Sequence, residues 1–166
     1  CKYLDIPLQH ASDSMLKSMR RGITSDKTRA LLDTVRNKIP NIAIRTTFIS
    51  GYPGETEQDH ETLIRFLEEL RFERVGVFTY SHEENTHAYT LNDDVDETTK
   101  QRRLDELMQV QQNISDSINQ KKIGKNFRTL FDRKEGNYFI GRTEYDSPEV
   151  DNEVLVDANE NYVRVG

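Results

Sequence analysis

Apolar residues along the first 95 positions alternate between a strand-like and a helix-like repeat. Runs of alternating apolar residues predict strands over residues 3–8, 42–50 and 75–80, and three- and four-residue spacing predicts helices over 13–19, 25–38 and 56–70. Thr56 with Asp59 three residues later is typical of a helix start. This element order is typical of parallel βαβ units with right-handed crossovers. Three strands are too few to close a barrel, so we predict an α/β fold that is the C-terminal part of a TIM-like (β/α) barrel.

The pattern changes after residue 95. Apolar side chains at helical spacing predict one long helix from Asp96 to about Lys122, which serves packing and ends before Gly124. A two-residue repeat then predicts strands over residues 127–131, 138–142, 154–156 and 162–165. We expect a small antiparallel β-barrel that lacks its last strand. The expected divisions are a barrel part (1–95), a connecting helix (96–125) and a β module (126–166).

Composition narrows the class of protein. The chain has 166 residues, a net charge of −6 and one cysteine, Cys1, which we interpret as structural. One cysteine excludes a disulfide framework and an all-cysteine metal site within the chain. No apolar run is long enough for a transmembrane helix. The scarcity of cysteine fits a reducing cytosol, so we expect a cytoplasmic protein. Because the chain starts at Cys1 and ends within a strand pattern, we interpret it as part of a longer protein.

Charge is distributed unevenly along the chain. The net charge is +4 over residues 1–40, −6 over 41–125 and −4 over 126–166. An acidic terminal module is not typical of nucleic-acid binding, which needs clustered Lys and Arg. The acidic charge complements a basic partner. A solvated acidic surface that promotes solubility is an equally good interpretation.

Candidate binding residues follow the predicted parallel strands, because ligands of such sheets bind at the carboxyl ends of strands. In the second strand, one side is more apolar, which would place Arg45 on the side that faces into the barrel together with Asp5 of the first strand. Two interpretations of Arg45 stay open. It forms an internal ion pair with Asp5, or it meets an anionic group of a bound cofactor.

The glycine turn after the second strand also has two interpretations. Gly51 and Gly54 allow the backbone to approach a ligand closely, or they form an ordinary strand-to-helix turn in which Glu55 is stabilised by the helix N–H groups. Spacing alone favours the ordinary turn. Phe78 and Tyr80 are expected to point inwards, where aromatic rings line a purine pocket or simply form part of the core.

The histidines do not predict a metal site. His60 lies in the middle of a helix and is expected to be exposed. His82 and His87, with Glu83 and Glu84, match no standard zinc spacing. No nucleophile–base set and no phosphate-binding P-loop is found in the sequence.

Three stretches of the sequence resemble one enzyme family. Residues 3–12 with 19–22 resemble the methylthiotransferase branch of the radical S-adenosylmethionine enzymes, and residues 45–56 are similar to that branch's glycine-rich cofactor strand. Residues 141–151 resemble the start of the TRAM domain in RimO-type ribosomal-protein methylthiotransferases. The tRNA-modifying MiaB type has Gln-Ser-Gly where this chain has Gln9, His10 and Ala11, so the RimO type is favoured.

The resemblance implies a reaction. A [4Fe–4S] cluster cleaves S-adenosylmethionine to a radical, which takes a hydrogen from the β-carbon of an aspartate in small-subunit ribosomal protein twelve, and a methylthio group is installed there. It further implies Gln9 as the catalytic residue near the reacting centre. The residues implied in binding S-adenosylmethionine are Arg45, Thr47, Ile49, Gly51, Phe78 and Tyr80. The TRAM domain would dock the basic ribosomal protein, and we expect no membrane, DNA or RNA partner.

Two departures from the family pattern limit these expectations. The three-cysteine cluster loop is absent, so the cluster ligands are expected outside this chain, and the chain alone is expected to be inactive. Glu55 is one residue farther from Gly51 than the superfamily motif usually has it. The alternatives are a MiaB-like tRNA adenosine methylthiotransferase and a non-catalytic partner-docking module.

Overall fold

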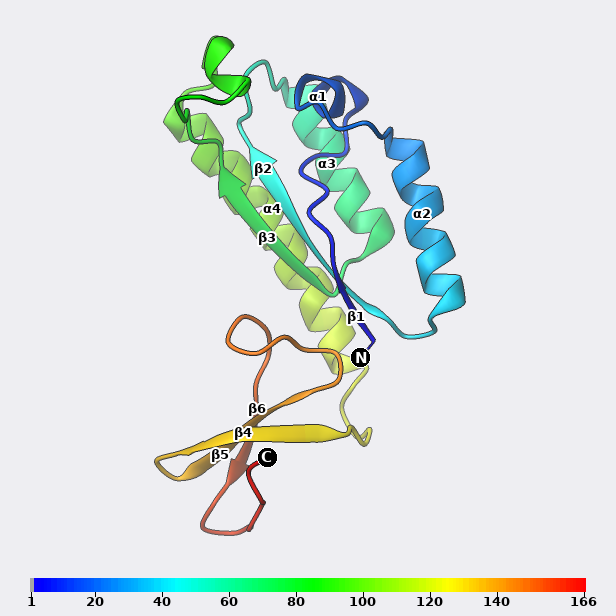
Figure 1. Ribbon diagram of the computed structural model, residues 1–166, viewed down its shortest axis with the longest axis vertical. Helices are drawn as coiled ribbons and strands as arrows, with labels where there is room; N and C mark the ends of the chain where they lie inside the picture. The colour runs from blue at the N-terminus through cyan, green and yellow to red at the C-terminus, as the bar shows by residue number, and fades with distance from the viewer. Residues whose placement is uncertain (1) are drawn as a thin grey trace.

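The computed structural model describes residues 2–166 and shows two parts joined by one long helix (Figure 1). The first part contains β1 (Tyr3–Asp5), α1 (Asp13–Ser18), α2 (Ser25–Lys38), β2 (Ala43–Ser50), α3 (Glu57–Leu70) and β3 (Arg74–Thr79). A 3-10 turn (Ala88–Thr90) and the long helix α4 (Glu97–Gln120) lead to β4 (Thr129–Glu135), β5 (Tyr138–Thr143) and β6 (Val154–Asp157). Cys1, interpreted above as structural, lies outside the described residues.

The first three strands form a parallel sheet in the order β1–β2–β3, which confirms the predicted α/β class. The predicted two sides of β2 are also confirmed. Ile44, Thr46 and Phe48 are fully buried, and their side of the sheet is covered by α2, α3 and α4 (Figure 1). We call the opposite side of the sheet, which carries Arg45 and Thr47, the inner face.

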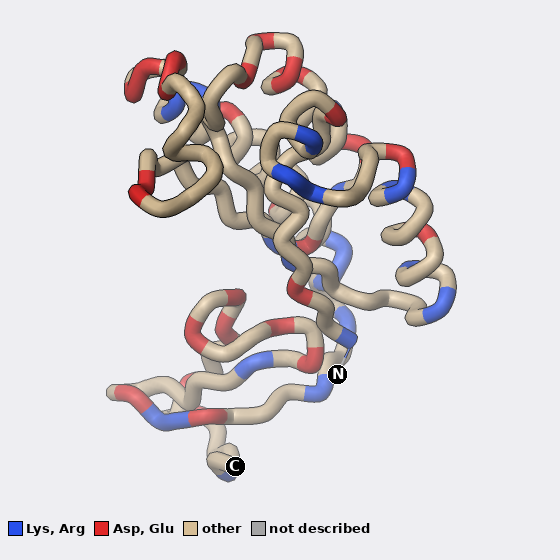
Figure 2. The backbone as a smooth tube through the Cα atoms, turned by 45° about the horizontal axis from the view of Figure 1, so that its top comes forward, with Lys and Arg blue, Asp and Glu red and all other residues tan. Residues whose placement is uncertain are grey.

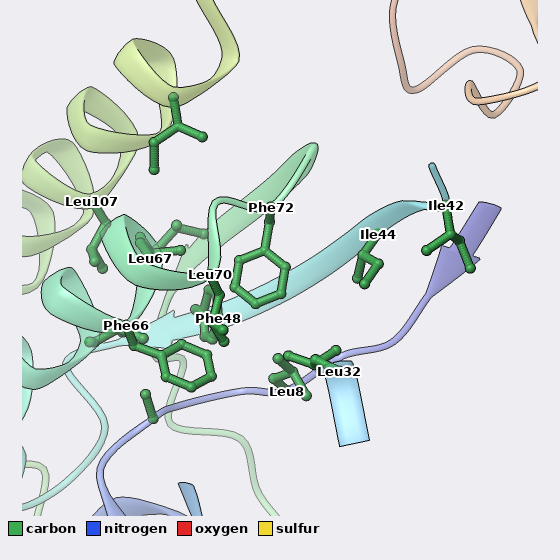
Figure 3. Close-up of a cluster of buried hydrophobic side chains, with 14 residues drawn as sticks. Leu8, Leu32, Ile42, Ile44, Phe48, Phe66, Leu67, Leu70, Phe72 and Leu107 are labelled. Carbon is green, nitrogen blue, oxygen red and sulfur yellow. The ribbon is translucent and has the colours of Figure 1, made fainter. Parts of the chain in front are cut away.

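The hydrophobic core lies between the sheet and these helices (Figure 3). The ring centroid of Phe48 lies 6.3 Å from that of Phe66 and 6.1 Å from that of Phe72, in edge-on contacts. Leu107 of α4 is fully buried in the same cluster. Burying each such side chain contributes about 1.5–3 kcal/mol. This core holds β2 firmly and leaves the inner face on a rigid support.

The predicted start of α3 is confirmed. The Thr56 backbone N–H donates to Asp59 Oδ2 (3.0 Å), and the Asp59 N–H donates to Thr56 Oγ1 (3.2 Å), which together form a capping box. The prediction that His60 is exposed is wrong. His60 is fully buried, with Nε2 2.7 Å from Glu106 Oε2 of α4, because it lies on the side of α3 that packs against α4.

The first strand is shorter than predicted. β1 ends at Asp5, and the chain pairs with β2 again at an isolated bridge between Gln9 and Phe48. Of the helices described from residue 2 onwards, none is long and apolar enough to cross a membrane.

The second part is an antiparallel sheet in the order β4–β5–β6. β4 begins two residues later than predicted and continues to Glu135, with a bulge between Phe131 and Arg133. The strand predicted over 162–165 is wrong, since residues 161–166 form no strand. This segment still contacts the sheet. The Gly166 N–H donates to the Phe131 carbonyl (3.0 Å), and the Tyr162 ring lies edge-on against Phe139 of β5 with centroids 6.2 Å apart.

Candidate functional site

A cavity of about 350 Å³ lies on the inner face at the carboxyl ends of the parallel strands. Thr47 and Ile49 of β2 lie on one side of it, and Gln9 lines it from the segment after β1. Phe78 of β3 and Tyr80 just beyond it complete the wall of the sheet. The loop after β3 closes the rim with Ser81, Glu83, Thr86 and Ala88. The location agrees with the general rule for ligand sites in parallel sheets.

Phe78 is the most informative residue of the cavity. It is 63% exposed on the inner face of β3, the edge strand of the sheet. Ile49 is its register partner on β2 and is half-buried, so the two side chains form one apolar surface. Covering a phenylalanine contributes about 1.5–3 kcal/mol. An exposed ring beside an apolar neighbour in a cavity therefore suits a planar ligand that stacks on it.

Gln9 is held in an unusual backbone conformation. Its φ angle is 74°, in the left-handed region that non-glycine residues rarely adopt. Its N–H donates to the Thr47 carbonyl (2.9 Å), and its own carbonyl accepts from the Ile49 N–H (2.9 Å). These bonds fix the segment to β2. The Gln9 side chain is thereby placed at the cavity on a strained but rigid backbone.

Tyr80 is buried at the side of the cavity. Its ring packs edge-on against Tyr52, with centroids 5.3 Å apart, and its hydroxyl lies 3.0 Å from Nδ1 of His82. Burial and then the negative charge of Asp93 raise the pKa of the Tyr80 phenol. Tyr80 therefore presents a neutral hydroxyl and ring in the neutral pH range.

The glycine loop beside the cavity is fixed by a buried carboxylate. Glu55 is 5% exposed and accepts the Gly51 N–H on Oε2 (2.9 Å). The Arg103 guanidinium of α4 donates to Glu55 Oε1 (2.9 Å), and His10 Nε2 lies 3.6 Å from Oε2. The expectation that Glu55 serves the start of the next helix is wrong, because α3 begins after Thr56 and the Glu55 side chain turns into the protein.

A second residue of α4 fits against the same loop. The buried Lys100 packs its aliphatic stem on Gly51, where an added Cβ would lie 2.1 Å from Lys100 Cγ. Its Nζ donates to Asp93 (2.8 Å) and Glu97 (2.7 Å). Sequence reasoning treated α4 as a packing helix and missed this role. Lys100 and Arg103 lie seven and four residues before the buried Leu107, on the same side of the helix, which is a signal that the sequence does contain.

Arg45 and Gly51 do not line the cavity, unlike the other predicted site residues. The Arg45 guanidinium instead donates to Asp151 of the second part (3.2 Å) and lies 3.7 Å from Asp5. The Asp151 side chain is nearly fully buried and also lies 3.5 Å from Arg74, which pairs with Asp146. The contacts of Arg45 are therefore those of an internal ion pair. Its shorter contact is with Asp151 in the second part of the chain, which the alternation of side chains along β2 could not predict.

One cluster among the described residues has metal-ligand chemistry. Glu57, His60 and Glu106 place their ligand atoms within 4.8 Å of one another. Arg102 donates to both carboxylates, and Arg103 donates to Glu57. These cations already neutralise the carboxylates, so the cluster is explained as a helix-to-helix ion network.

Comparison with known proteins gives consistent results. A family model described as the radical SAM superfamily matches residues 1–67, and one described as the TRAM domain matches residues 123–166. The protein named ribosomal protein uS12 methylthiotransferase RimO in Christiangramia forsetii is 61% identical over the whole of this chain, which covers 37% of that relative. The protein of the same name in Flavobacterium johnsoniae is 59% identical over the whole chain and 38% of the relative.

A solved structure, the radical SAM enzyme coproporphyrinogen III oxidase (HemN) from Escherichia coli, matches with a TM-score of 0.58 at 20% identity. The match covers 68% of this chain and 27% of that chain, and it supports the fold. The chain spans little more than a third of the length of these curated relatives.

Proposed function

We propose, from the premise that this chain belongs to the RimO-type radical S-adenosylmethionine methylthiotransferases, that its cavity holds the nucleoside of S-adenosylmethionine. The observation that carries the proposal is the exposed Phe78 beside Ile49 in a cavity at the strand ends. A volume of about 350 Å³ is within the range of small-ligand sites.

The residues at the cavity fit such a cofactor. Phe78 and Ile49 would cover the purine, Thr47 and Tyr80 would supply hydroxyl groups, and Gln9 would meet the reacting part of the substrate. When bound, the cofactor supplies a radical that removes a hydrogen atom from the substrate. The protein's task is then to orient both molecules and to exclude water. Glu55, Arg103 and Lys100 serve this task by fixing the glycine loop.

The residues of this chain do not fit an iron–sulfur cluster. Such clusters are held by several cysteine thiolates, and the chain has one cysteine. We therefore derive no step through a cluster from this chain. Its ligands would come from the remainder of the enzyme, for which the longer relatives leave room.

The proposed substrate is an aspartate of small-subunit ribosomal protein uS12, the protein in the names of the relatives. The second part of the chain carries a net charge of −4 over residues 126–166, which complements a basic ribosomal protein. The product would be an aspartate residue that carries a methylthio group on its β-carbon.

The proposal is tested with the full-length enzyme and its Phe78→Ala variant. Loss of the stacking surface should weaken S-adenosylmethionine binding at least about tenfold, a loss of about 1.4 kcal/mol. Leu155→Ala, which removes a comparably exposed side chain (57%) from β6, is the control and should bind normally. Equal affinity of wild type and Phe78→Ala would remove the main support.

The substrate is tested by mass spectrometry of uS12 and of tRNA from cells that lack the gene. Loss of the methylthio mass on the uS12 aspartate is expected. Loss of a methylthio mark on tRNA with uS12 unchanged would instead favour the MiaB-like function.

A further inference from the structure

A groove of about 450 Å³ lies between the parallel sheet and the long helix α4, and we call it the edge groove. Residues 73–75, where β3 begins, form one wall of the edge groove. The other wall belongs to α4 and includes Asp105, Gln111 and Asp116. Because the edge groove lies at the amino end of β3 and the cavity lies at the carboxyl ends of the strands, the two are separate sites.

The free edge of β3 opens into the edge groove. β3 is the last strand in the order β1–β2–β3, so among the described residues its second edge has no strand partner. The Tyr80 N–H donates to the Ser50 carbonyl of β2 (2.8 Å). Backbone groups along a paired strand point alternately to its two sides, so those of Val75, five residues earlier in unbroken register, point to the free edge. Unpaired edge groups of this kind bind extended peptides as an added strand.

The α4 wall contains a hydrogen-bond acceptor that lacks a donor. Gln111 is 5% exposed, and its Nε2 donates to the Phe72 carbonyl (3.0 Å). Its Oε1 is buried and has no hydrogen-bond partner among the described residues. Buried polar atoms of folded proteins are almost always paired. A donor group of a ligand in the edge groove would supply the missing partner.

The edge groove is negatively charged. Asp105 and Asp116 are exposed, and among residues 2–166 neither forms an ion pair. Asp105 accepts only a neutral donor, Nε2 of Gln101 (2.8 Å). The positive charge of Arg74 in the opposite wall is neutralised by Asp146. The edge groove therefore favours a cationic ligand.

The acidic surface continues beyond the edge groove. Residues 144–153, between β5 and β6, contain five carboxylates and no Lys or Arg. Figure 2 shows acidic positions along this loop, on the side of the second part that faces the first part. The bond between Arg74 and Asp146 holds the loop beside the start of β3. A basic partner complements this combined charge.

We propose that the edge groove binds a basic polypeptide segment, in extended conformation, as an added strand beside β3. Backbone pairing with the free edge gives affinity, and Lys or Arg side chains of the segment reach the carboxylates of α4. Asp105 and Asp116 are eleven residues apart on α4, about 16 Å along the helix, so the edge groove takes about five residues of extended chain. The proposal does not depend on the cavity or on the methylthio chemistry, and either can fail alone.

The test uses the full-length protein and a fluorescein-labelled peptide of twelve residues that alternates lysine and threonine. Binding is followed by anisotropy at 50 and 200 mM salt, and it should weaken at the higher salt because the charges are screened. The double variant Asp105→Asn, Asp116→Asn should weaken binding at 50 mM salt at least about fivefold and reduce the effect of salt. No binding by the wild-type enzyme would show that the edge groove is closed and would overturn the proposal.

The matched control changes two exposed aspartates of α2 in the same way, Asp26→Asn and Asp33→Asn. α3 lies between α2 and α4, so these positions are remote from the edge groove (Figure 1). The control has the same net charge as the first double variant and should bind as the wild type does. Equal loss of affinity in both double variants, or in neither, would overturn the proposal.

The added strand is tested at Val75. The change Val75→Pro removes the N–H that points to the free edge, and an edge strand tolerates proline at such a position. It should weaken binding at least about fivefold and leave the effect of salt unchanged. Val75→Ala shortens the side chain but keeps the N–H, so it should bind as the wild type does. Equal affinities of the two Val75 variants would contradict strand addition.

Two further measurements on the wild-type enzyme do not depend on how the variants fold. The unlabelled peptide should slow hydrogen exchange of the backbone amides in residues 75–79, because they become paired. Spermine at equal charge should compete poorly with the labelled peptide, since it has no backbone to pair with β3. Unchanged exchange in β3, or equal competition by spermine, would show a general polycation surface and overturn the proposal.

Discussion

Replacing Arg103 by methionine tests whether α4 holds the glycine loop. The Arg103 side chain is 6% exposed, and its Nη1 donates to both the carbonyl (3.0 Å) and the carboxylate (2.9 Å) of Glu55. Without it, the buried Glu55 carboxylate keeps only the Gly51 N–H and the more distant His10. Removing one partner of a buried ion pair costs about 3–5 kcal/mol, because the other charge stays buried.

The change Glu55→Gln should lower the free energy of unfolding less than Arg103→Met does. Its amide oxygen still accepts the Gly51 N–H, and Arg103 keeps the Glu55 carbonyl and the Glu57 carboxylate (3.1 Å). We expect a loss of about 1–3 kcal/mol for this change. The double variant should be less destabilised than the sum of the two single variants, by about 1 kcal/mol or more.

The free energy of unfolding is measured by urea denaturation, followed by tyrosine fluorescence because the chain has no tryptophan. Arg102→Met is the matched control. Arg102 precedes Arg103 on α4 but is 44% exposed, and it pairs with exposed carboxylates. Exposed pairs contribute about 1 kcal/mol or less. Equal destabilisation by Arg102→Met and Arg103→Met would refute the assigned role.

Two further predictions concern the loop and the start of α3. Gly54→Ala should lower the free energy of unfolding by about 1–2 kcal/mol, because its backbone is left-handed. Gly51→Ala should lower it by about 1–3 kcal/mol more, because its Cβ would also collide with Lys100. Equal losses of the two variants in urea denaturation would contradict this packing. Burial raises the pKa of Asp59, but hydrogen bonds from Ser12, Thr56 and Ser14 lower it to about 2. Since this lies below the pKa of an unfolded aspartate, about 3.9, the stabilisation is complete above about pH 5 and is lost as the pH falls towards 2. The Asp59→Asn variant should therefore lose less free energy of unfolding than the wild type does as the pH falls. A pH profile equal to that of the wild type would contradict this role of Asp59.

The sequence was sufficient to predict which side chains share a face of the sheet. Strand side chains alternate with a period of two, and the apolar content of β2 differs between its sides, so Thr47, Ile49 and Phe78 could be placed together before the structure was known. The assigned roles of these residues stay predictions. Only their positions at one cavity are described by the structure.

The contacts between distant segments could not be predicted in this way. Glu55 and Arg103 are 48 residues apart, and Arg45 and Asp151 are 106 apart, so no local repeat connects them. His60 was misplaced for the same reason, since its burial depends on where α4 packs. In the second part, the bulge in β4 shifts the pairing by a residue, which alternation alone does not reveal.

The ion pairs that Asp151 forms with Arg45 and Arg74 lie at one end of the inner face of the sheet, and the cavity lies at the other end. Arg45 and Arg74 meet Asp151 near the amino ends of β2 and β3, whereas the cavity opens at the carboxyl ends. At about 3.3 Å per residue, the five steps from Arg45 to Ser50 cover about 17 Å. Under the proposed function, a polypeptide bound by the second part would have to extend at least that far to reach the cavity, a length equal to about five residues of extended polypeptide.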